Sequence, residues 1–415
     1  MKAPAPPPQT EEIAREQTGP LAADRVTIVI LNWNRAAETA ACLESLAQAE
    51  LGGAAIVVVD NGSRDDSVAR LRERYPGVRV VALPENRGFA GGANAGITAA
   101  LEAGAEGVLL LNNDTQVAPD FLRPLIDAMN ASPWSAGVAS AIFRLDRPDM
   151  LDVAYAEVCF EDRHAVHILG VNALPGEGFD HRREVQVAVG CCLLLKAAAL
   201  RRVGLFDEAF FAYHEDVDWC LRARRIGYQL FYEPYSRVYH QGSGSTTPLR
   251  ARPAPAASGG SEDTLPNAEP LPWNPIRTYL GIRNTVRLLA RYANKKQRIA
   301  FARACLRELP LEFTALLMDE AGRMKLGHWS YARFRQAYFV ERHPWLARPA
   351  RGRAGACARA AAFAVTVPVD VCWCLPRDVW RAWRRGRFGE FVEYLRGLRD
   401  GVLGRRLPLR RLRLR

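Results

Sequence analysis

The sequence lacks several features that would place it in a common protein class. No pair of its nine cysteines has the Cys-x-x-Cys spacing of a zinc site. No stretch reaches the roughly 18 uninterrupted apolar residues of a membrane-spanning helix. Residues 1–24 lack the apolar core of a signal peptide. We therefore expect a cytoplasmic protein with reduced thiols, most of which act as small core residues.

The chain also lacks the two commonest nucleotide-binding loops. Its Gly-rich segment, 85–96, has no Gly-Lys-Ser/Thr of a P-loop, and its glycines do not match the dinucleotide fingerprint. Gly88, Gly91 and Gly92 would still let the backbone approach a ligand, and Arg87 could pair with a phosphate. Close packing of a helix on a strand is the alternative explanation for these glycines.

Positive charge, in contrast, is abundant and is concentrated near the C-terminal end. The 415 residues carry a net charge of +11, and residues 371–415 contribute +9, with thirteen Arg against four acidic residues. Such a segment favours an anionic partner, either lipid headgroups or nucleic acid. No recognised nucleic-acid-binding fold accompanies it, so we expect peripheral contact with an anionic membrane and no nucleic acid. A solvated tail, or a packed helical domain without a membrane role, is the alternative.

Composition divides the chain into four segments. Residues 1–24 are rich in Pro and Glu, which predicts a disordered tail. Residues 248–272 are rich in Pro, Ala, Gly and Ser, and this composition predicts a flexible linker or loop. Between them, 25–247 show alternating strand and helix patterns. Residues 273–415 are basic and mostly helical in pattern, and they hold six of the nine Trp.

Continuous apolar runs predict strands covered on both faces, as in a mainly parallel sheet. The expected strands are 26–31, 55–60, 78–82, 108–112, 136–143, 187–196 and 229–240. The expected helices are 36–48, 64–75, 89–103 and 215–226, with Ser63 and Asp66 as a capping pair for the second. This alternation indicates an α/β fold with helices on both faces of a mixed sheet, in which ligands bind beyond the carboxyl ends of the strands.

Polar residues stand at these strand ends. Asp60 ends the second strand before a Gly turn, where its carboxylate could hold a base or ribose, although an Asx turn uses the same residues. Asn112-Asn113-Asp114 ends the fourth strand. One carboxylate beside amide oxygens suits a hard divalent cation, and a simple turn is the alternative.

Acidic residues cluster at the predicted start of a later helix. Asp218 could be explained by a favourable interaction with the helix dipole. That explains less well why His214, Glu215 and Asp216 are adjacent after an aromatic run that could exclude water. Elsewhere, the adjacent Cys191 and Cys192 suggest a zinc or redox pair, but nothing else in the chain supplies that chemistry, so we expect small buried residues.

Four motifs, in this order, carry a resemblance to a known family. They are Asn-Trp-Asn (32–34), Val-Val-Val-Asp-Asn-Gly-Ser-Arg-Asp (57–65), Asn-Arg-Gly-Phe-Ala-Gly-Gly-Ala-Asn-Ala-Gly (86–96) and Leu-Leu-Asn-Asn-Asp (110–114). Together they resemble the family 2 glycosyltransferases of GT-A fold, most of all the bacterial rhamnosyltransferase-like branch. The resemblance covers about 26–245 closely, so that 25–247 would be the GT-A domain, and it extends loosely into 273–300.

The resemblance implies roles for individual residues. The nucleotide sugar would be bound by Asn32, Asp60, Asp65, Arg87, Gly88, Gly91, Asn94, Asn112 and Asn113. A divalent cation, Mg or Mn, would be bound by Asp114 and His240, although Asn112 replaces the first Asp of the family's Asp-x-Asp motif. Asp216 would be the general base, with Glu215 in support. The sugar and acceptor pocket would be lined by Gly190, Cys191, Cys192 and Trp219.

The resemblance also implies an activity. The protein would be an inverting glycosyltransferase, a hexosyltransferase that moves a sugar from dTDP-rhamnose or a UDP-sugar to a hydroxyl of a glycan or lipid-linked glycan. Its place would be bacterial cell-surface polysaccharide synthesis, in the cytoplasm and peripherally on the inner face of the cell membrane. A sugar-phosphate nucleotidyltransferase with a GT-A-like fold and a non-catalytic nucleotide-sugar-binding protein are the alternatives.

Overall fold

The computed structural model of the chain describes residues 19–162, 165–174, 176–241, 275–304, 395–397 and 399–402. The predicted linker, 248–272, lies outside the described residues, as do 1–18 of the N-terminal tail and most of the basic segment 371–415. Among the described helices, none is long and apolar enough to cross a membrane.

The centre of the protein is a mixed sheet that confirms the predicted α/β class. Along the sheet the strands follow the order β10-β12-β6-β11-β4-β1-β2-β3. Their bounds are β1 Val26–Asn32, β2 Ala55–Asp60, β3 Arg79–Ala82, β4 Gly107–Asn112, β6 Ser135–Arg144, β10 Arg183–Glu184, β11 Cys192–Lys196 and β12 Gln229–His240. Two short strands, β5 Thr115–Val117 and β7 Leu151–Val153, pair with β12 and β6. A separate hairpin joins β8 Tyr155–Val158 and β9 Val166–Leu169.

The pairing divides the sheet into two halves. Strands β3, β2, β1 and β4 are parallel, and so are β6 and β12, whereas β11 is antiparallel to both of its neighbours. In the parallel half, Asn32 pairs with Asp60 and Leu31 with Asn112. The residues that follow these strands therefore meet at one edge of the sheet.

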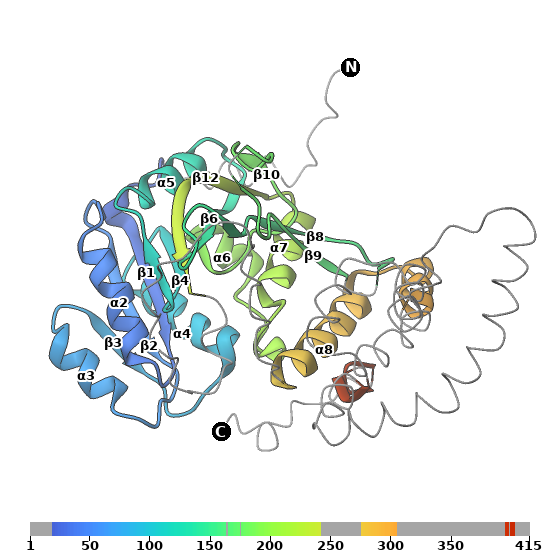
Figure 1. Cartoon of the computed structure of the whole chain (residues 1–415), viewed down its shortest axis with the longest axis horizontal. Helices are drawn as coiled ribbons and strands as arrows, with labels where there is room; N and C mark the ends of the chain where they lie inside the picture. Colours follow the sequence, from blue (N-terminus) through green and yellow to red (C-terminus); the bar gives the residue numbers. More distant parts are fainter. Residues whose placement is uncertain are drawn as a thin grey trace, which may run out of the picture.

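Helices cover both faces, as the continuous apolar runs predicted. On β1, Ile28 and Ile30 belong to the core shared with α2 (Ala36–Ala47), α3 (Ser67–Arg74) and α5 (Leu122–Asn130). The intervening Val29 belongs to the core shared with α4 (Gly88–Glu102), α6 (Ala197–Val203) and α7 (Glu215–Arg225). Two short 3-10 helices complete this part, η1 (Ala23–Arg25) and η2 (Glu208–Phe210). Figure 1 shows α2 and α3 on one side of the sheet and α7 on the other.

The strand expected at 187–196 begins later than predicted. Strand β11 starts at Cys192, and Val187 instead forms an isolated bridge with Ala156. The preceding residues are apolar because they are buried, with Val187 and Ala188 both 0% exposed. A run of apolar residues indicates that the side chains on both faces of the segment are buried. It does not show whether the segment is a paired strand or a buried loop.

Helix α8 (Pro275–Tyr292) packs on the α/β core beside α7 (Figure 1). Leu288 and Leu289 join the same core as α4 and α7. The short helical stretches 395–397 and 399–402 in turn pack on α8, where the Tyr279 hydroxyl donates to Asp400 at 3.0 Å. Part of the predicted helical, basic C-terminal region is thus attached to the core.

Candidate active site

A buried polar network holds the end of β2. Asp60 is 1% exposed. Its carboxylate accepts hydrogen bonds from Asn32 Nδ2 (2.7 Å), from the Ser63 hydroxyl (2.6 Å) and from the Ser63 main-chain N–H (2.9 Å). The Thr39 hydroxyl donates to Asn32 Oδ1 at 2.8 Å, so both ends of that amide are engaged. Asn32 therefore orients Asp60 from inside the protein.

Ser63 and Asp66 do not form the expected capping pair. The Ser63 hydroxyl contacts Asp60, while Asp66 is the residue before α3 and makes no side-chain cap bond. The helix start is instead contacted by Asp65, which is exposed and accepts a hydrogen bond from the Ser67 N–H at 3.1 Å. The N-cap serine of a capping box accepts from a main-chain N–H of the first helical turn, but α3 begins only at Ser67, so Ser63 lies too early to cap it.

The Gly-rich segment packs tightly on the residues that precede α7. Gly88 has a φ of +73°, and a Cβ atom on it would lie 2.3 Å from the Phe211 carbonyl oxygen. The Ala90 N–H donates to the same oxygen at 3.0 Å. On the other side, Asn61 accepts from the Arg87 N–H (3.0 Å) and donates to the Gly88 carbonyl (2.9 Å). Close packing therefore accounts for Gly88.

Arg87 and Asn94 both contact the chain around η2. Arg87 Nη2 lies 2.8 and 2.9 Å from the two carboxylate oxygens of Glu208, and both side chains are partly exposed. A Cβ atom on Gly91 would lie 2.6 Å from Arg87 Cβ. Asn94 is 6% exposed and pairs with the main-chain N–H and carbonyl of Phe206 at 3.0 and 2.9 Å. Asn94 thus ties the start of α4 to the chain before η2, and its contact with the nucleotide sugar stays a prediction.

The turn after β4 places Asp114 against the end of β12. His240 Nε2 lies 3.3 Å from Asp114 Oδ1, and His240 Nδ1 lies 2.7 Å from Asp152 Oδ2. Asn113 donates to the Thr39 hydroxyl at 3.0 Å. Burial lowers the pKa of His240, but hydrogen bonds and charges from Asp114 and Asp152 outweigh it and raise the pKa to about 9. The two expected metal ligands are thus brought together.

Asp114 and His240 have the chemistry and spacing for a divalent cation. Octahedral ligands about 2.1 Å from a metal are about 3 Å apart, close to the 3.3 Å between these side chains. Among the described residues, no group of three or more His, Cys, Asp and Glu side chains could hold a metal. A cation here would therefore complete its shell with water and substrate oxygens. Asp152 would hold the second ring nitrogen of His240, as carboxylates commonly do for metal-binding histidines.

Glu215 and Asp216 begin α7 and form a buried acidic pair. Glu215 is 6% exposed, and its Oε2 atom has no hydrogen-bond partner among the described residues. Burial, reinforced by the charge of Asp216, raises the pKa of Glu215 to about 8. Burial also raises the pKa of Asp216, although its carboxylate accepts main-chain hydrogen bonds from Gly190 (2.9 Å) and Val217 (2.8 Å). A carboxylate with a raised pKa can accept a proton near neutral pH.

Two consecutive residues connect this acidic pair to the turn after β4. The Gly190 N–H donates to Asp216, and the Cys191 carbonyl accepts from the Asn112 N–H at 2.9 Å. A Cβ atom on Gly190 would lie 3.3 Å from Asp216 Oδ2. The candidate base and the candidate metal ligand Asp114 therefore stand on either side of Gly190-Cys191, at the edge where the parallel strands end.

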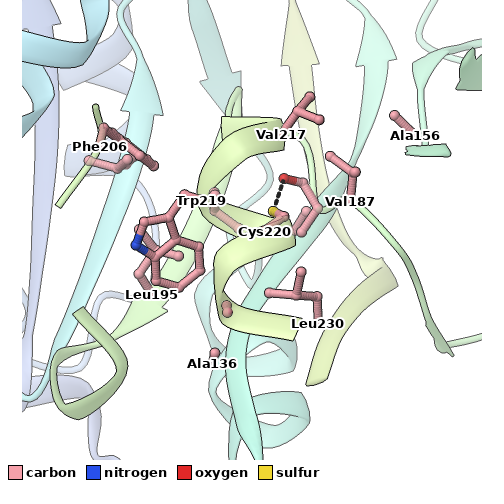
Figure 2. Close-up of a cluster of buried hydrophobic side chains, with 14 of the residues drawn as sticks. Ala136, Ala156, Val187, Leu195, Phe206, Val217, Trp219, Cys220 and Leu230 are labelled. Carbon is pink, nitrogen blue, oxygen red and sulfur yellow. Dashed lines mark hydrogen bonds between the residues drawn. The ribbon is translucent and has the colours of Figure 1, made fainter. Parts of the chain in front are cut away.

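Two of the expected pocket residues lie in the core. Trp219 is 0% exposed and donates from Nε1 to the Gly204 carbonyl at 2.8 Å. Figure 2 shows its indole near Phe206 and Leu195 in a cluster of buried apolar side chains. Cys192 is also 0% exposed, within β11. The helix and the strand that carry Trp219 and Cys192 turn these side chains inward, and their part in a sugar or acceptor pocket stays a prediction.

The adjacent Cys191 and Cys192 lie in the protein interior, as expected for small buried residues. Both thiols are free and buried. Burial, with a further contribution from the charge of Asp114, raises the pKa of Cys191 well above its ordinary value, and burial raises the pKa of Cys192 to about 12. Thiols that stay protonated do not bind zinc or attack disulfides readily.

Several residues of the site were missed in the sequence. Asp152 supports His240, Glu208 pairs with Arg87, and Asn284 on α8 contacts the segment before Glu215. Each comes from a different segment, and none stands in one of the four motifs. The only available signal was weak: Arg283-Asn284 falls where the resemblance extends into a helix.

Comparison with known proteins agrees with the motifs. The family described as "Glycosyl transferase family 2" matches residues 27–152, and "Glycosyl transferase family group 2" matches 107–333, more than half of the chain. An "N-acetylglucosaminyl-diphospho-decaprenol L-rhamnosyltransferase" from Mycobacterium tuberculosis is 29% identical over 242 residues, which cover 54% of this chain and 78% of the relative.

Two further proteins are similar at lower identity. The "dTDP-rhamnosyl transferase RfbF" of Shigella flexneri is 25% identical over 188 residues, covering 45% of this chain and 59% of the relative. The solved mannosyltransferase PcManGT of Pyrobaculum calidifontis, in complex with GDP-Man and Mn2+, is 16% identical, has a TM-score of 0.43 and covers 93% of this chain and 92% of its own. On the two family matches, the chain belongs to the family 2 glycosyltransferases and is an enzyme of the rhamnosyltransferase-like kind.

Proposed function

We propose that the protein is an inverting hexosyltransferase that moves rhamnose from dTDP-rhamnose to a hydroxyl of a lipid-linked glycan in bacterial cell-surface polysaccharide synthesis. The observation that carries the proposal is the position of Asp216. Its carboxylate stands at the carboxyl edge of the parallel strands, held by the N–H groups of Gly190 and Val217. The next residue after Gly190, Cys191, accepts a hydrogen bond from Asn112 at the end of β4.

The chemistry follows from that carboxylate. Asp216 accepts the proton of the acceptor hydroxyl while the hydroxyl oxygen forms a bond to the anomeric carbon. The bond from that carbon to the diphosphate oxygen breaks on the opposite face, and the nucleoside diphosphate leaves with the electron pair. General base catalysis of this kind contributes about 10²- to 10⁴-fold. Burial favours it, because it raises the pKa of Asp216 toward the working pH.

The donor would lie along the ends of β1, β2 and β4. Asp60 and Asp65 flank the β2 turn, and Arg87 lies within the Gly-rich segment 85–96. Because Arg87 is paired with Glu208 in this structure, binding of a diphosphate would require the guanidinium to exchange that carboxylate for phosphate oxygens. Asp60 would use its remaining carboxylate lone pair to accept a hydrogen bond from the nucleobase of the donor, while Asn32 and Ser63 hold the Asp60 carboxylate in place.

A divalent cation, Mg or Mn, would be held by Asp114 and His240. When bound, it supplies positive charge that stabilises the departing diphosphate. The residues of this chain orient the ligands: Asp152 fixes the His240 ring, and Asn113 is tied to Thr39 below the turn. Asn112 in place of a first carboxylate leaves the site with a single protein carboxylate, which suits an ion that keeps several waters.

The acceptor proposal comes from the relatives' names and from the charge of the chain. The mycobacterial relative is named for an acceptor that carries N-acetylglucosamine on a diphospho-decaprenol. A lipid-linked acceptor is presented at a membrane surface. Residues 371–415, with a charge of +9 and three Trp, would hold the protein peripherally on the inner, anionic face by charge and aromatic burial. The proposed location is therefore the cytoplasm.

The test is a transfer assay with the intact chain. Purified protein would be incubated with Mn or Mg, a polyprenyl-diphospho-N-acetylglucosamine acceptor, and either dTDP-rhamnose or a panel of UDP-sugars. Asp216→Asn should lower kcat by about 10²- to 10⁴-fold and leave the donor Kd, from titration calorimetry, unchanged. The matched control is Asp127→Asn, an exposed Asp on α5. Transfer by Asp216→Asn at the rate of the control would remove Asp216 from the mechanism.

A further inference from the structure

Asn284 on α8 contacts the chain just before the catalytic pair. It is 0% exposed. Its Nδ2 atom lies 3.0, 2.8 and 2.7 Å from the main-chain carbonyl oxygens of Phe210, Ala212 and Tyr213. An amide nitrogen carries only two hydrogens, so one of them is shared between acceptors. One buried side chain thus gathers three carbonyl groups of a four-residue stretch.

The two neighbours of Asn284 on α8 reinforce this contact. Arg283 Nη1 donates to Asn284 Oδ1 at 2.9 Å and to the Ala209 carbonyl at 3.0 Å. The Thr285 hydroxyl lies 3.2 Å from His214 Nε2. Three consecutive residues of α8 therefore bind both ends and the middle of segment 209–214.

The segment has an unfavourable backbone conformation. Phe211, Tyr213 and His214 have φ angles of 68°, 68° and 70°. Residues other than Gly, Asn and Asp rarely adopt such positive φ angles. Such a conformation persists only when surrounding contacts impose it, and it clusters at functional sites.

The opposite side of the segment is closed by the Gly-rich loop. The Phe211 carbonyl accepts from Ala90 and lies so close to Gly88 that no side chain fits there. Segment 209–214 is therefore held between the start of α4, where the donor would bind, and the middle of α8. His214 is the residue that precedes α7, so the path of this segment sets where Glu215 and Asp216 begin.

We propose that Asn284 is a positioning residue: by gathering the carbonyl groups of Phe210, Ala212 and Tyr213, it holds segment 209–214 in its strained path and thereby places the Asp216 carboxylate. The catalytic part of this inference rests on the proposed function, in which Asp216 is the base. Its structural part, that the segment keeps its conformation through Asn284, does not. An apolar residue at this position would fill the same space and gather none of the carbonyl groups.

The experiment compares Asn284→Ala with Leu288→Ala in the full chain. Leu288 is 0% exposed in the core, one turn further along the same helix, and has no role at the site. Three quantities are measured: kcat for transfer, the donor Kd by calorimetry, and amide hydrogen exchange of peptides covering 209–216. A displacement of the base by about 1 Å can cost about 100-fold in rate.

Asn284→Ala should therefore lower kcat by about 10- to 100-fold, leave the donor Kd unchanged and accelerate exchange at 211–216. Leu288→Ala should lower Tm and change neither kcat nor that exchange. Thr285→Val, which keeps the shape and loses the bond to His214, should lower kcat less and in the same direction; it replaces Asn284→Ala if that variant does not fold.

Wild-type kcat in folded Asn284→Ala, or an equal loss of kcat in Leu288→Ala, would overturn the inference. If Thr285→Val is the variant measured, wild-type kcat together with unchanged exchange overturns it. If the wild-type chain transfers no sugar, the proposed function has failed, and exchange alone decides: accelerated exchange at 211–216 in Asn284→Ala supports the positioning role, and unchanged exchange overturns it.

Discussion

Replacing Glu215 by Gln should make the protein more stable at alkaline pH. Glu215 is buried, its Oε2 atom has no partner among the described residues, and burial beside Asp216 raises its pKa from 4.5 to about 8. Between these two values the unfolded chain has lost the proton and the folded chain still holds it. The free energy of unfolding therefore falls as pH rises from about 4.5, and the loss is complete above about 8.

The size of the effect follows from the two pKa values. The full difference corresponds to on the order of 5 kcal/mol, of which about 1 kcal/mol is lost at pH 5 and about 4 kcal/mol at pH 8. Gln is isosteric with the protonated acid and does not ionise, so Glu215→Gln avoids this loss. In a domain of this size 1 kcal/mol shifts Tm by about 2–4 °C. The variant should melt about 10 °C above the wild type at pH 8 and within a few degrees of it at pH 5.

Thermal unfolding followed by circular dichroism from pH 5 to pH 9 measures this difference. The control is Glu102→Gln, an exposed Glu at the end of α4, which should show no pH-dependent gain. A constant Tm difference between Glu215→Gln and the wild type across this range would refute the argument, because it would mean that Glu215 ionises alike in the folded and unfolded chains.

Three other substitutions or conditions test the rest of the site. Asp114→Ala should weaken binding of Mn together with a nucleotide diphosphate, measured by calorimetry, and transfer that survives EDTA in the wild type would contradict the metal proposal. Gly88→Ala should lower Tm, since the added Cβ would lie 2.3 Å from the Phe211 oxygen at a φ of +73°; an unchanged Tm would mean that the packing is loose. The intact chain should co-sediment with anionic vesicles at low salt and not with neutral ones, because each basic residue contributes about 1 kcal/mol near such a surface. Equal binding to both would exclude the charge-based attachment.

The order of strands and helices in the parallel half of the sheet could be predicted from the sequence. Three of the parallel strands were recognisable because each is a run of apolar residues, as expected for strands covered on both faces. They are Val26–Asn32, Ala55–Asp60 and Gly107–Asn112. The alternation of Ile28 and Ile30 with Val29 between two cores follows from the pleat of a strand. The edge that carries Asp60 and Asp114 was also predictable, since parallel strands end on the same side.

The fate of single polar and aromatic side chains was not predictable in this way. Asn94 was expected at the ligand and is bound to Phe206, and Trp219 was expected in the pocket and lies in the core. A motif gives the position of a residue along the chain. Whether its side chain faces the site depends on which segment packs against it, and that segment is distant in sequence.

The sequence by itself thus determined the α/β class, the family and the edge of the sheet where the site lies, because these depend on local periodicity and on residues adjacent to strand ends. Only the tertiary structure decided that Asp152 supports His240, that Gly190 binds Asp216 and that Asn284 holds the strained segment before α7. Those contacts join segments far apart in the chain. They form through the packing of the whole domain, which no local pattern records.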